Sequence, residues 1–231
     1  MVRLLILVKK AEWQNLTVPK MFTETAKRLP GKVMFYFQDE TWTFQQVEEY
    51  SNRVANFFLS QNMKKGDRYF SNFLIQIKAW LLESFCLFFS VAIFMENRPE
   101  YVATWLGLSK IGVIPALINY NLKQKALLHT VQVANSKAII YGVELASQVS
   151  EIIQPLKNGS VLFPTFSSGN PSHKQASVPG TVDLNEALGS ASKDPVPKEI
   201  QDSIGFKEKL LYIYTSGTTG LPKAAVIKHS R

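Results

Sequence analysis

The chain has 231 residues, of which 46% are hydrophobic and 19% are charged; this is ordinary for a globular protein and excludes disorder throughout. Its 26 basic and 18 acidic residues give a net charge of +8, and because the basic residues are scattered, the charge indicates a polyanionic ligand or a membrane surface and not a nucleic-acid-binding patch. The single cysteine, Cys86, excludes an internal disulfide and fits a reducing compartment.

The first residues contain too short an apolar run to cross a bilayer. Only Leu4 to Val8 is apolar before Lys9 and Lys10. This is far below the roughly 20 residues that a bilayer span requires, and it is short even for the core of a signal peptide. We therefore treat residues 1–15 as an N-terminal stub ahead of a domain that covers residues 16–231.

The next residues predict a hairpin followed by an amphipathic helix. Residues 32–37 and 41–44 have the composition of two short strands separated by a polar turn. Thr43 and Gln46 have the spacing of a capping box, which predicts that a helix begins here. The apolar residues of this helix recur at helical spacing and are expected to face the core: Val47, Tyr50, Val54, Phe57 and Phe58.

Residues 68–90 are unusually aromatic, with seven aromatic side chains in one short segment. A membrane helix over Phe70 to Met95 would be long enough to span a bilayer. However, Lys78 and Glu83 lie in the middle of that segment, where each charge costs about 2.5–3.5 kcal/mol, whereas each Leu, Ile or Phe contributes only about −0.3 to −0.6 kcal/mol. The sum is marginal, so we disfavour a membrane span.

From residue 91 onward, the patterns of strand and helix alternate. Strands are expected over residues 91–95, 113–117, 136–141 and 161–166, and helices over residues 99–111, 122–134 and 145–156. Asn97 is the expected N-cap of the first of these helices, with Pro99 in its first turn and Gly112 at its C-terminal end. The alternation predicts an α/β fold in which helices flank a mostly parallel sheet.

Residues 167–203 are poor in apolar periodicity and rich in Ser, Pro, Gly and Lys. We interpret them as a surface excursion with one short helix near Val182 to Leu188 and a loop over Asp194 to Pro197. Residues 207–209 then lead into the last two apolar runs of the chain.

Those two runs, Leu210 to Tyr214 and Ala224 to Ile227, flank a polar loop. With its edges, the loop reads Tyr214, Thr215, Ser216, Gly217, Thr218, Thr219, Gly220, Leu221, Pro222 and Lys223. Its two glycines let backbone N–H groups approach an anion closely, and its hydroxyls and lysine add donors and positive charge. This composition predicts a cradle for a polyphosphate.

Three other interpretations of the loop are weaker. The Gly-Lys-Ser/Thr spacing of a P-loop NTPase is absent. No glycine-rich helix start follows the strand, as a dinucleotide-binding fold requires. A plain polar hairpin is the remaining alternative, because Gly, Ser and Thr are ordinary turn residues.

The ten positions from Tyr214 to Lys223 resemble the phosphate-loop signature of the acyl-adenylate-forming enzymes, which favours the polyphosphate cradle over a plain hairpin. The longer run over residues 212–225, followed by His229 to Arg231, resembles the fatty acid transport proteins, also called very long-chain acyl-CoA synthetases. Two upstream stretches agree: residues 40–44 with residues 50–58, and residues 91–101. The resemblance covers residues 16–67 and 91–231.

The resemblance implies an N-terminal part of an AMP-binding domain that takes part in an ATP-dependent ligase reaction. A long-chain or very long-chain fatty acid is joined to AMP and then transferred to CoA, with Mg²⁺ bridging the phosphates, and the reaction is coupled to fatty acid uptake. The implied ATP contacts are Tyr214, Thr215, Ser216, Gly217, Thr218, Thr219, Gly220 and Lys223. The implied location is the plasma membrane or the endoplasmic reticulum, with the catalytic domain facing the cytosol. The resemblance also allows an oligomer between this chain and the full-length protein.

Two features depart from the resembled family. Residues 68–90 have no counterpart in it, and removing them would join Asp67 directly to Val91, so we hypothesise an unspliced or misassembled insertion. A transcript that always contains this segment would contradict that hypothesis. The Mg²⁺-binding Glu and the adenylating Lys of the family fall beyond Arg231, so residues 16–231 make an incomplete AMP-binding domain and no catalytic residue is assigned.

We therefore expect the purified 231-residue chain to form no acyl-CoA by itself. Detectable thioester product from fatty acid, ATP and CoA would contradict this expectation. The alternative function is that of a shortened, non-catalytic form that binds lipid, a membrane or a protein partner.

The three histidines are given no metal-binding role. His129 and His173 have no Cys, Asp or Glu at metal-ligand spacing, and we predict structural roles for both. His229 lies where the resembled family contacts the acyl site, and a capping or packing role for it is equally open. Lys228 and Arg231 are expected to be solvated.

Overall fold

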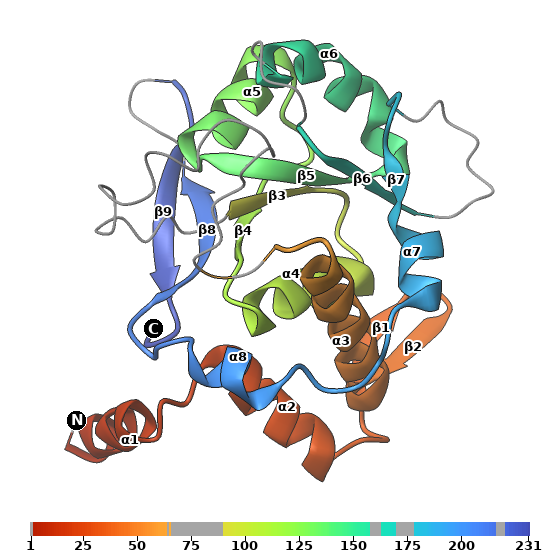
Figure 1. The fold of residues 1–231 in the computed structure, drawn as a ribbon. Coiled ribbons are helices and arrows are strands. Elements are labelled where there is room, and N and C mark those ends of the chain that lie inside the picture. Colours follow the sequence, from red (N-terminus) through yellow and green to blue (C-terminus); the bar gives the residue numbers. More distant parts are fainter. Residues whose placement is uncertain (1, 64, 66–89, 158–162, 170–177, 216–219) are drawn as a thin grey trace, which may run out of the picture.

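A seven-stranded sheet organises the part of the chain that the structure describes (Figure 1). The structure is a computed structural model, and it describes residues 2–63, 65, 90–157, 163–169, 178–215 and 220–231. The strand order of the sheet is β7-β6-β5-β3-β4-β8-β9. The strands are β3 (Ser90–Phe94), β4 (Ile114–Leu117), β5 (Ser136–Gly142), β6 (Thr165–Ser168), β7 (Val182–Asp183), β8 (Lys209–Thr215) and β9 (Lys223–Lys228).

All strand pairs in this sheet are parallel except the last one. β3 pairs with β4 and β5, β4 with β8, β5 with β6, and β6 with β7 in parallel, whereas β8 and β9 are antiparallel. This confirms the predicted mostly parallel sheet. The chain runs from β3 to β4 on one side and then crosses to β5 on the other side, so the switch point of the topology lies between β3 and β5.

Helices cover both faces of the sheet (Figure 1). One face carries α3 (Phe44–Ser60), α4 (Pro99–Lys110) and α7 (Leu184–Ser190), and the other carries α5 (Gln124–Val133) and α6 (Ala146–Lys157). Because both faces are covered, every residue of β3 is buried. The other elements are the hairpin of β1 (Val33–Phe37) and β2 (Glu40–Thr43), the helices α1 (Val2–Trp13), α2 (Val18–Arg28) and α8 (Lys198–Asp202), and the 3₁₀ turn Val143–Leu145.

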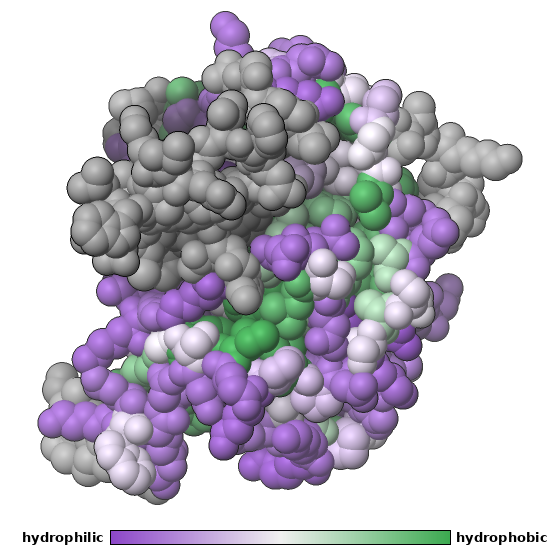
Figure 2. All heavy atoms as spheres, in the orientation of Figure 1, coloured by the Kyte–Doolittle hydropathy of each residue, from purple (hydrophilic) through white to green (hydrophobic). Residues whose placement is uncertain are grey.

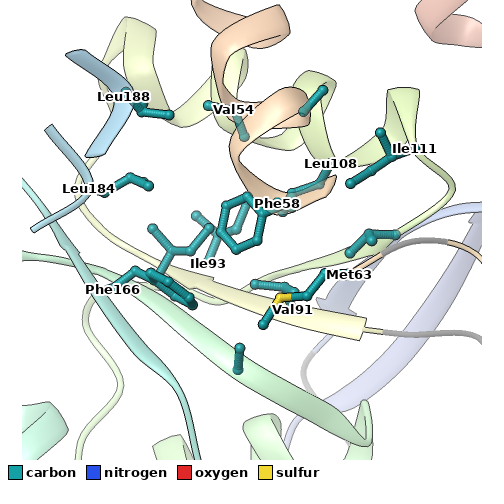
Figure 3. Packing of buried hydrophobic residues seen from close by; sticks show 14 of the residues in the cluster. Val54, Phe58, Met63, Val91, Ile93, Leu108, Ile111, Phe166, Leu184 and Leu188 are labelled. Atoms are coloured by element: carbon teal, nitrogen blue, oxygen red, sulfur yellow. The ribbon is translucent and has the colours of Figure 1, made fainter. Parts of the chain in front are cut away.

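The main hydrophobic core lies between α3, α4, α7 and the sheet (Figure 3). The ring of Phe58 meets that of Phe166 edge to face, with the ring centres 5.0 Å apart, and Leu184 and Leu188 of α7 belong to the same cluster. The predicted core face of α3 is confirmed, with Val47, Val54 and Phe58 fully buried and Tyr50 and Phe57 half-buried. On the side of the molecule seen in Figure 2, hydrophobic residues lie in the middle, with hydrophilic residues to the right of them and below.

The starts of α3 and α4 follow from local sequence. Thr43 Oγ1 accepts from the Gln46 N–H at 3.2 Å and Gln46 Oε1 accepts from the Thr43 N–H at 2.7 Å, which confirms the capping box. The N-cap of α4 is Arg98 and not the predicted Asn97. A residue before proline avoids the helical conformation, so this helix begins at the proline itself. Gly112 ends the helix as predicted, with a φ of +73°.

Residues 178–203 are more ordered than the predicted surface excursion. β7 joins the sheet, α8 adds a second helix, and Leu184, Leu188 and Val196 are buried in the main core. Arg53 Nη1 of α3 also donates to the carbonyl oxygen of Ala191 at 2.8 Å. The predicted short helix near Val182 to Leu188 is confirmed by α7. The prediction that this segment is only a surface excursion was wrong, because its few apolar residues are buried in the main core. Residues 194–197 are loop, as predicted.

The N-terminal residues form two helices, α1 and α2, that the sequence analysis does not predict. Asn15, between the two helices, donates from Nδ2 to the carbonyl of Ile204 at 2.9 Å and accepts at Oδ1 from the Phe206 N–H at 2.7 Å. Lys20 forms an ion pair with Asp202 at 2.7 Å. These contacts hold the N-terminal segment next to α8 and the approach to β8.

Residues 68–89 of the aromatic segment lie outside the described residues, so the insertion hypothesis stays a prediction. Ser90 to Phe94, at the end of the disfavoured membrane segment, form the buried strand β3. Among the described residues, none of the helices combines the length and the apolar character that crossing a membrane requires.

Candidate functional site

The predicted phosphate loop connects β8 to β9 at the edge of the sheet (Figure 1). Because β8 is parallel to β4, its end at Thr215 lies at the carboxyl edge, where open α/β sheets bind ligands. Thr215 pairs with Lys223 across the ladder, so the structure brings the two ends of the loop together. Gly220 has a φ of +82°, which glycine adopts without strain. Ser216, Gly217, Thr218 and Thr219 lie outside the described residues.

Lys223 is available to an anion at this end of the loop. Its side chain is exposed, and it makes no ion pair with any residue that the structure describes. A Cβ atom placed on Gly220 would meet nothing within 4 Å, so the space beside this residue is open. An ammonium group and backbone N–H groups around an open space can bind a phosphate. The described part of the loop thus offers an exposed ammonium group and an open space at Gly220.

Helix α5 holds both ends of the loop. Tyr214 Oη donates to the carbonyl oxygen of Thr130 at 2.7 Å, and His129 Nε2 donates to the carbonyl oxygen of Pro222 at 3.2 Å. Burial raises the pKa of Tyr214, so the phenol keeps the proton that its bond requires. These contacts give His129 the structural role predicted for it. The contacts themselves cannot be predicted from the sequence, because the partners lie 84 and 93 residues apart and share no pattern.

His229 caps a helix. Its side chain is only 5% exposed, and Nδ1 accepts a hydrogen bond at 3.3 Å from the N–H of Val18, the first residue of α2. Thr17, at the N-cap, makes no capping hydrogen bond through its own side chain, so the imidazole takes over that role. Of the two roles left open for His229, the structure shows the capping one. Lys228 and Arg231 are exposed, as predicted, and His173 lies outside the described residues.

The His229 cap predicts a loss of stability in acid. Burial lowers the pKa of His229 to about 4 from its ordinary 6.5, against the weaker opposing effect of Glu208. The unfolded chain therefore binds more protons between these two values, so the free energy of unfolding falls as the pH drops from 6.5 to 4. We expect a loss on the order of 2 kcal/mol, measured by urea unfolding at about pH 7 and about pH 4.5. His229→Gln should flatten this dependence, and an unchanged pH profile in that variant would refute the assignment.

A polar cleft of about 450 Å³ lies away from the loop, at the switch point between β3 and β5. Arg98 Nη1 lies 3.3 Å from each carboxylate oxygen of Glu144, and Nη2 donates to the carbonyl oxygen of Ser168 at 2.7 Å. The ion pair already neutralises the arginine, so these contacts mainly tie the ends of β3, β5 and β6 together. No group of His, Cys, Asp and Glu side chains is arranged to hold a metal ion in the described part of the chain.

Comparison with known proteins identifies the family. The model of the AMP-binding enzyme family matches residues 89–231. Long-chain fatty acid transport protein 1 of Rattus norvegicus is 36% identical over 217 residues, which cover 93% of this chain and 29% of that protein. Long-chain fatty acid transport protein 6 of Homo sapiens is 33% identical over 230 residues, covering 98% of this chain and 32% of that protein. The chain thus spans about a third of the length of these relatives.

Solved structures show the same fold. The anthranilate CoA ligase AuaEII, in complex with anthranoyl-AMP, is 18% identical with a TM-score of 0.72, and the match covers 93% of this chain and 35% of that one. The N-terminal domain of FACL13 from Mycobacterium tuberculosis, with an inhibitor bound, is 23% identical with a TM-score of 0.62, and the match covers 92% of this chain and 44% of that one. The chain therefore belongs to the AMP-binding enzyme family and has the fold of the N-terminal part of the acyl-adenylate-forming enzymes.

Proposed function

We propose that this chain carries the phosphate-binding part of an ATP-dependent long-chain or very long-chain fatty acid–CoA ligase that is coupled to fatty acid uptake. The observation that carries the proposal is the loop from Thr215 to Lys223, which starts at the carboxyl edge of the sheet and ends at an exposed lysine. The similarity to long-chain fatty acid transport proteins supports the choice of substrate.

The proposed reaction forms an acyl-adenylate and then a thioester. The fatty acid carboxylate attacks the α-phosphorus of ATP and pyrophosphate leaves; the CoA thiol then displaces AMP. The loop N–H groups, the hydroxyls of the loop and Lys223 hold the β- and γ-phosphates and stabilise the charge of the departing pyrophosphate. Mg²⁺, when bound with ATP, supplies further charge neutralisation at these phosphates.

We also propose that the protein works at a membrane surface, at the plasma membrane or the endoplasmic reticulum, with this domain on the cytosolic side. The net charge of +8 supports this, because anionic cytosolic leaflets attract basic proteins. Flotation of the chain with liposomes that contain anionic phospholipid tests the proposal. A chain that stays at the bottom of the gradient at low salt would refute it.

The phosphate site is tested by isothermal titration calorimetry, which measures the affinity of the chain for magnesium pyrophosphate and for MgATP. Lys223→Ala is expected to weaken binding about tenfold, because a charge-assisted hydrogen bond contributes about 1.5–3 kcal/mol. Lys228→Ala is the matched control, since Lys228 is an exposed lysine at the other end of the same strand. Equal affinities for the two variants would refute the phosphate site.

A further inference from the structure

Two hydrogen bonds join α5 to the two ends of the predicted phosphate loop. Tyr214, at the start of the loop, donates to the carbonyl of Thr130, and the carbonyl of Pro222, at its end, accepts from His129. The two partners on α5 are consecutive residues, and α5 packs against β9. One helix therefore contacts the chain on both sides of the loop.

The Tyr214 bond uses a carbonyl that a helix leaves without a partner. α5 ends at Val133, so Thr130 is the first of its last four residues, whose carbonyls lack the next helical N–H. Thr130 itself is fully buried, and its hydroxyl donates to the carbonyl of Leu127 at 2.7 Å. The tyrosine hydroxyl thus satisfies a buried backbone acceptor and fixes the start of the loop to the helix.

The His129 bond lies just outside the β8–β9 ladder. The ladder closes at the pair of Thr215 and Lys223, and Pro222 is the residue before β9 begins. Proline has no N–H, so its carbonyl is the only backbone hydrogen-bonding group of Pro222. A carbonyl only accepts, so His129 carries a proton on Nε2. Because the Pro222 carbonyl and the Lys223 N–H belong to one planar peptide unit, the histidine fixes the orientation of that unit.

We propose that His129 is a positioning residue of the phosphate site, which fixes the peptide unit before Lys223 and thereby positions the lysine side chain for bound phosphates. The inference rests on the proposed function, because it assigns His129 to the same loop. His129 touches no phosphate itself and acts only through Pro222.

The test compares three variants of the whole chain. His129→Leu removes the donor, His129→Gln retains a side-chain N–H that can reach the same carbonyl, and Gln132→Leu is the control at an exposed position of the same helix. The affinity for magnesium pyrophosphate is measured by calorimetry, and the amide signal of Lys223 by ¹⁵N–¹H NMR. The melting temperature of each variant shows whether the fold is kept.

We expect His129→Leu to weaken pyrophosphate binding about fivefold to tenfold and to shift the Lys223 amide signal, with His129→Gln restoring both and Gln132→Leu changing neither. A shifted amide signal without any saturable binding in the unsubstituted chain would overturn the proposed function but keep the contact. Unchanged affinity and an unchanged Lys223 signal in a folded His129→Leu chain would overturn the positioning role.

Discussion

Replacing Lys110 with methionine is expected to lower the free energy of unfolding by about 3–5 kcal/mol. Lys110 is the last residue of α4, and its side chain is only 2% exposed. Its Nζ lies 2.8 Å from Glu48 Oε2 and 2.6 Å from Asn52 Oδ1, both on α3. Burial lowers the pKa of Lys110, and the charge of Glu48 opposes that change. Without the lysine, the largely buried carboxylate of Glu48 keeps its desolvation cost and loses its counter-charge.

The chain offers a matched control for this prediction. Lys193 and Glu49 form another lysine–glutamate pair with α3, but at 3.4 Å and with the lysine side chain 58% exposed. An exposed pair of this kind contributes about 0–1 kcal/mol, so Lys193→Met should change stability little. Adding Glu48→Gln to Lys110→Met should recover part of the loss. Urea unfolding measures all four proteins, and equal losses for Lys110→Met and Lys193→Met would contradict the prediction.

Gly107→Ala is expected to destabilise the protein by about 3 kcal/mol, at the upper end of the usual cost of overpacking. Gly107 lies inside α4, where α3 approaches closely. A Cβ atom at this position would lie 2.5 Å from the carbonyl oxygen of Ser51 and 2.7 Å from Cβ of Val54, which Figure 3 shows in the main core. Neither atom can move without shifting α3, so the two helices must separate.

Helix propensity alone predicts the opposite result. Alanine is about 1 kcal/mol more favourable than glycine inside a helix. Gly189 of α7 is the control, because a Cβ atom there would meet nothing within 4 Å. Gly189→Ala should therefore be neutral or slightly stabilising in the same thermal or urea unfolding experiment. If both alanine variants gain stability, the prediction that the close approach of α3 and α4 makes Gly107→Ala destabilising is wrong.

Local patterns were sufficient for most of the helices and strands. The spacing of Thr43 and Gln46 predicts where α3 begins, and the apolar residues of α3 predict which face is buried. Gly112 predicts the end of α4, because its left-handed conformation is open to glycine. The alternation of strand and helix patterns predicts the mostly parallel sheet. The helix ends and the buried face of α3 depend on residues within a few positions of one another, which is the range over which capping and periodicity act.

Contacts between distant segments were not predictable in the same way. Val196 sits in a loop and gives no periodic signal, yet it is buried as part of the main core. The cap of α2 comes from His229, which is 211 residues away from Val18. No local rule places an acceptor there, because the acceptor arrives only when the last strand has packed beside the N-terminal segment.

By itself, the sequence determined the fold class, the family and the position of the loop that we propose binds phosphate, because each of these depends on the order of neighbouring residues along the chain. Only the tertiary structure decided what holds that loop. Tyr214 and Pro222 meet Thr130 and His129 because the strand order of the sheet places β8 and β9 beyond β4, and β9 packs against α5. Buried polar groups must find partners wherever the packing brings them, so these partners depend on the topology and not on sequence spacing.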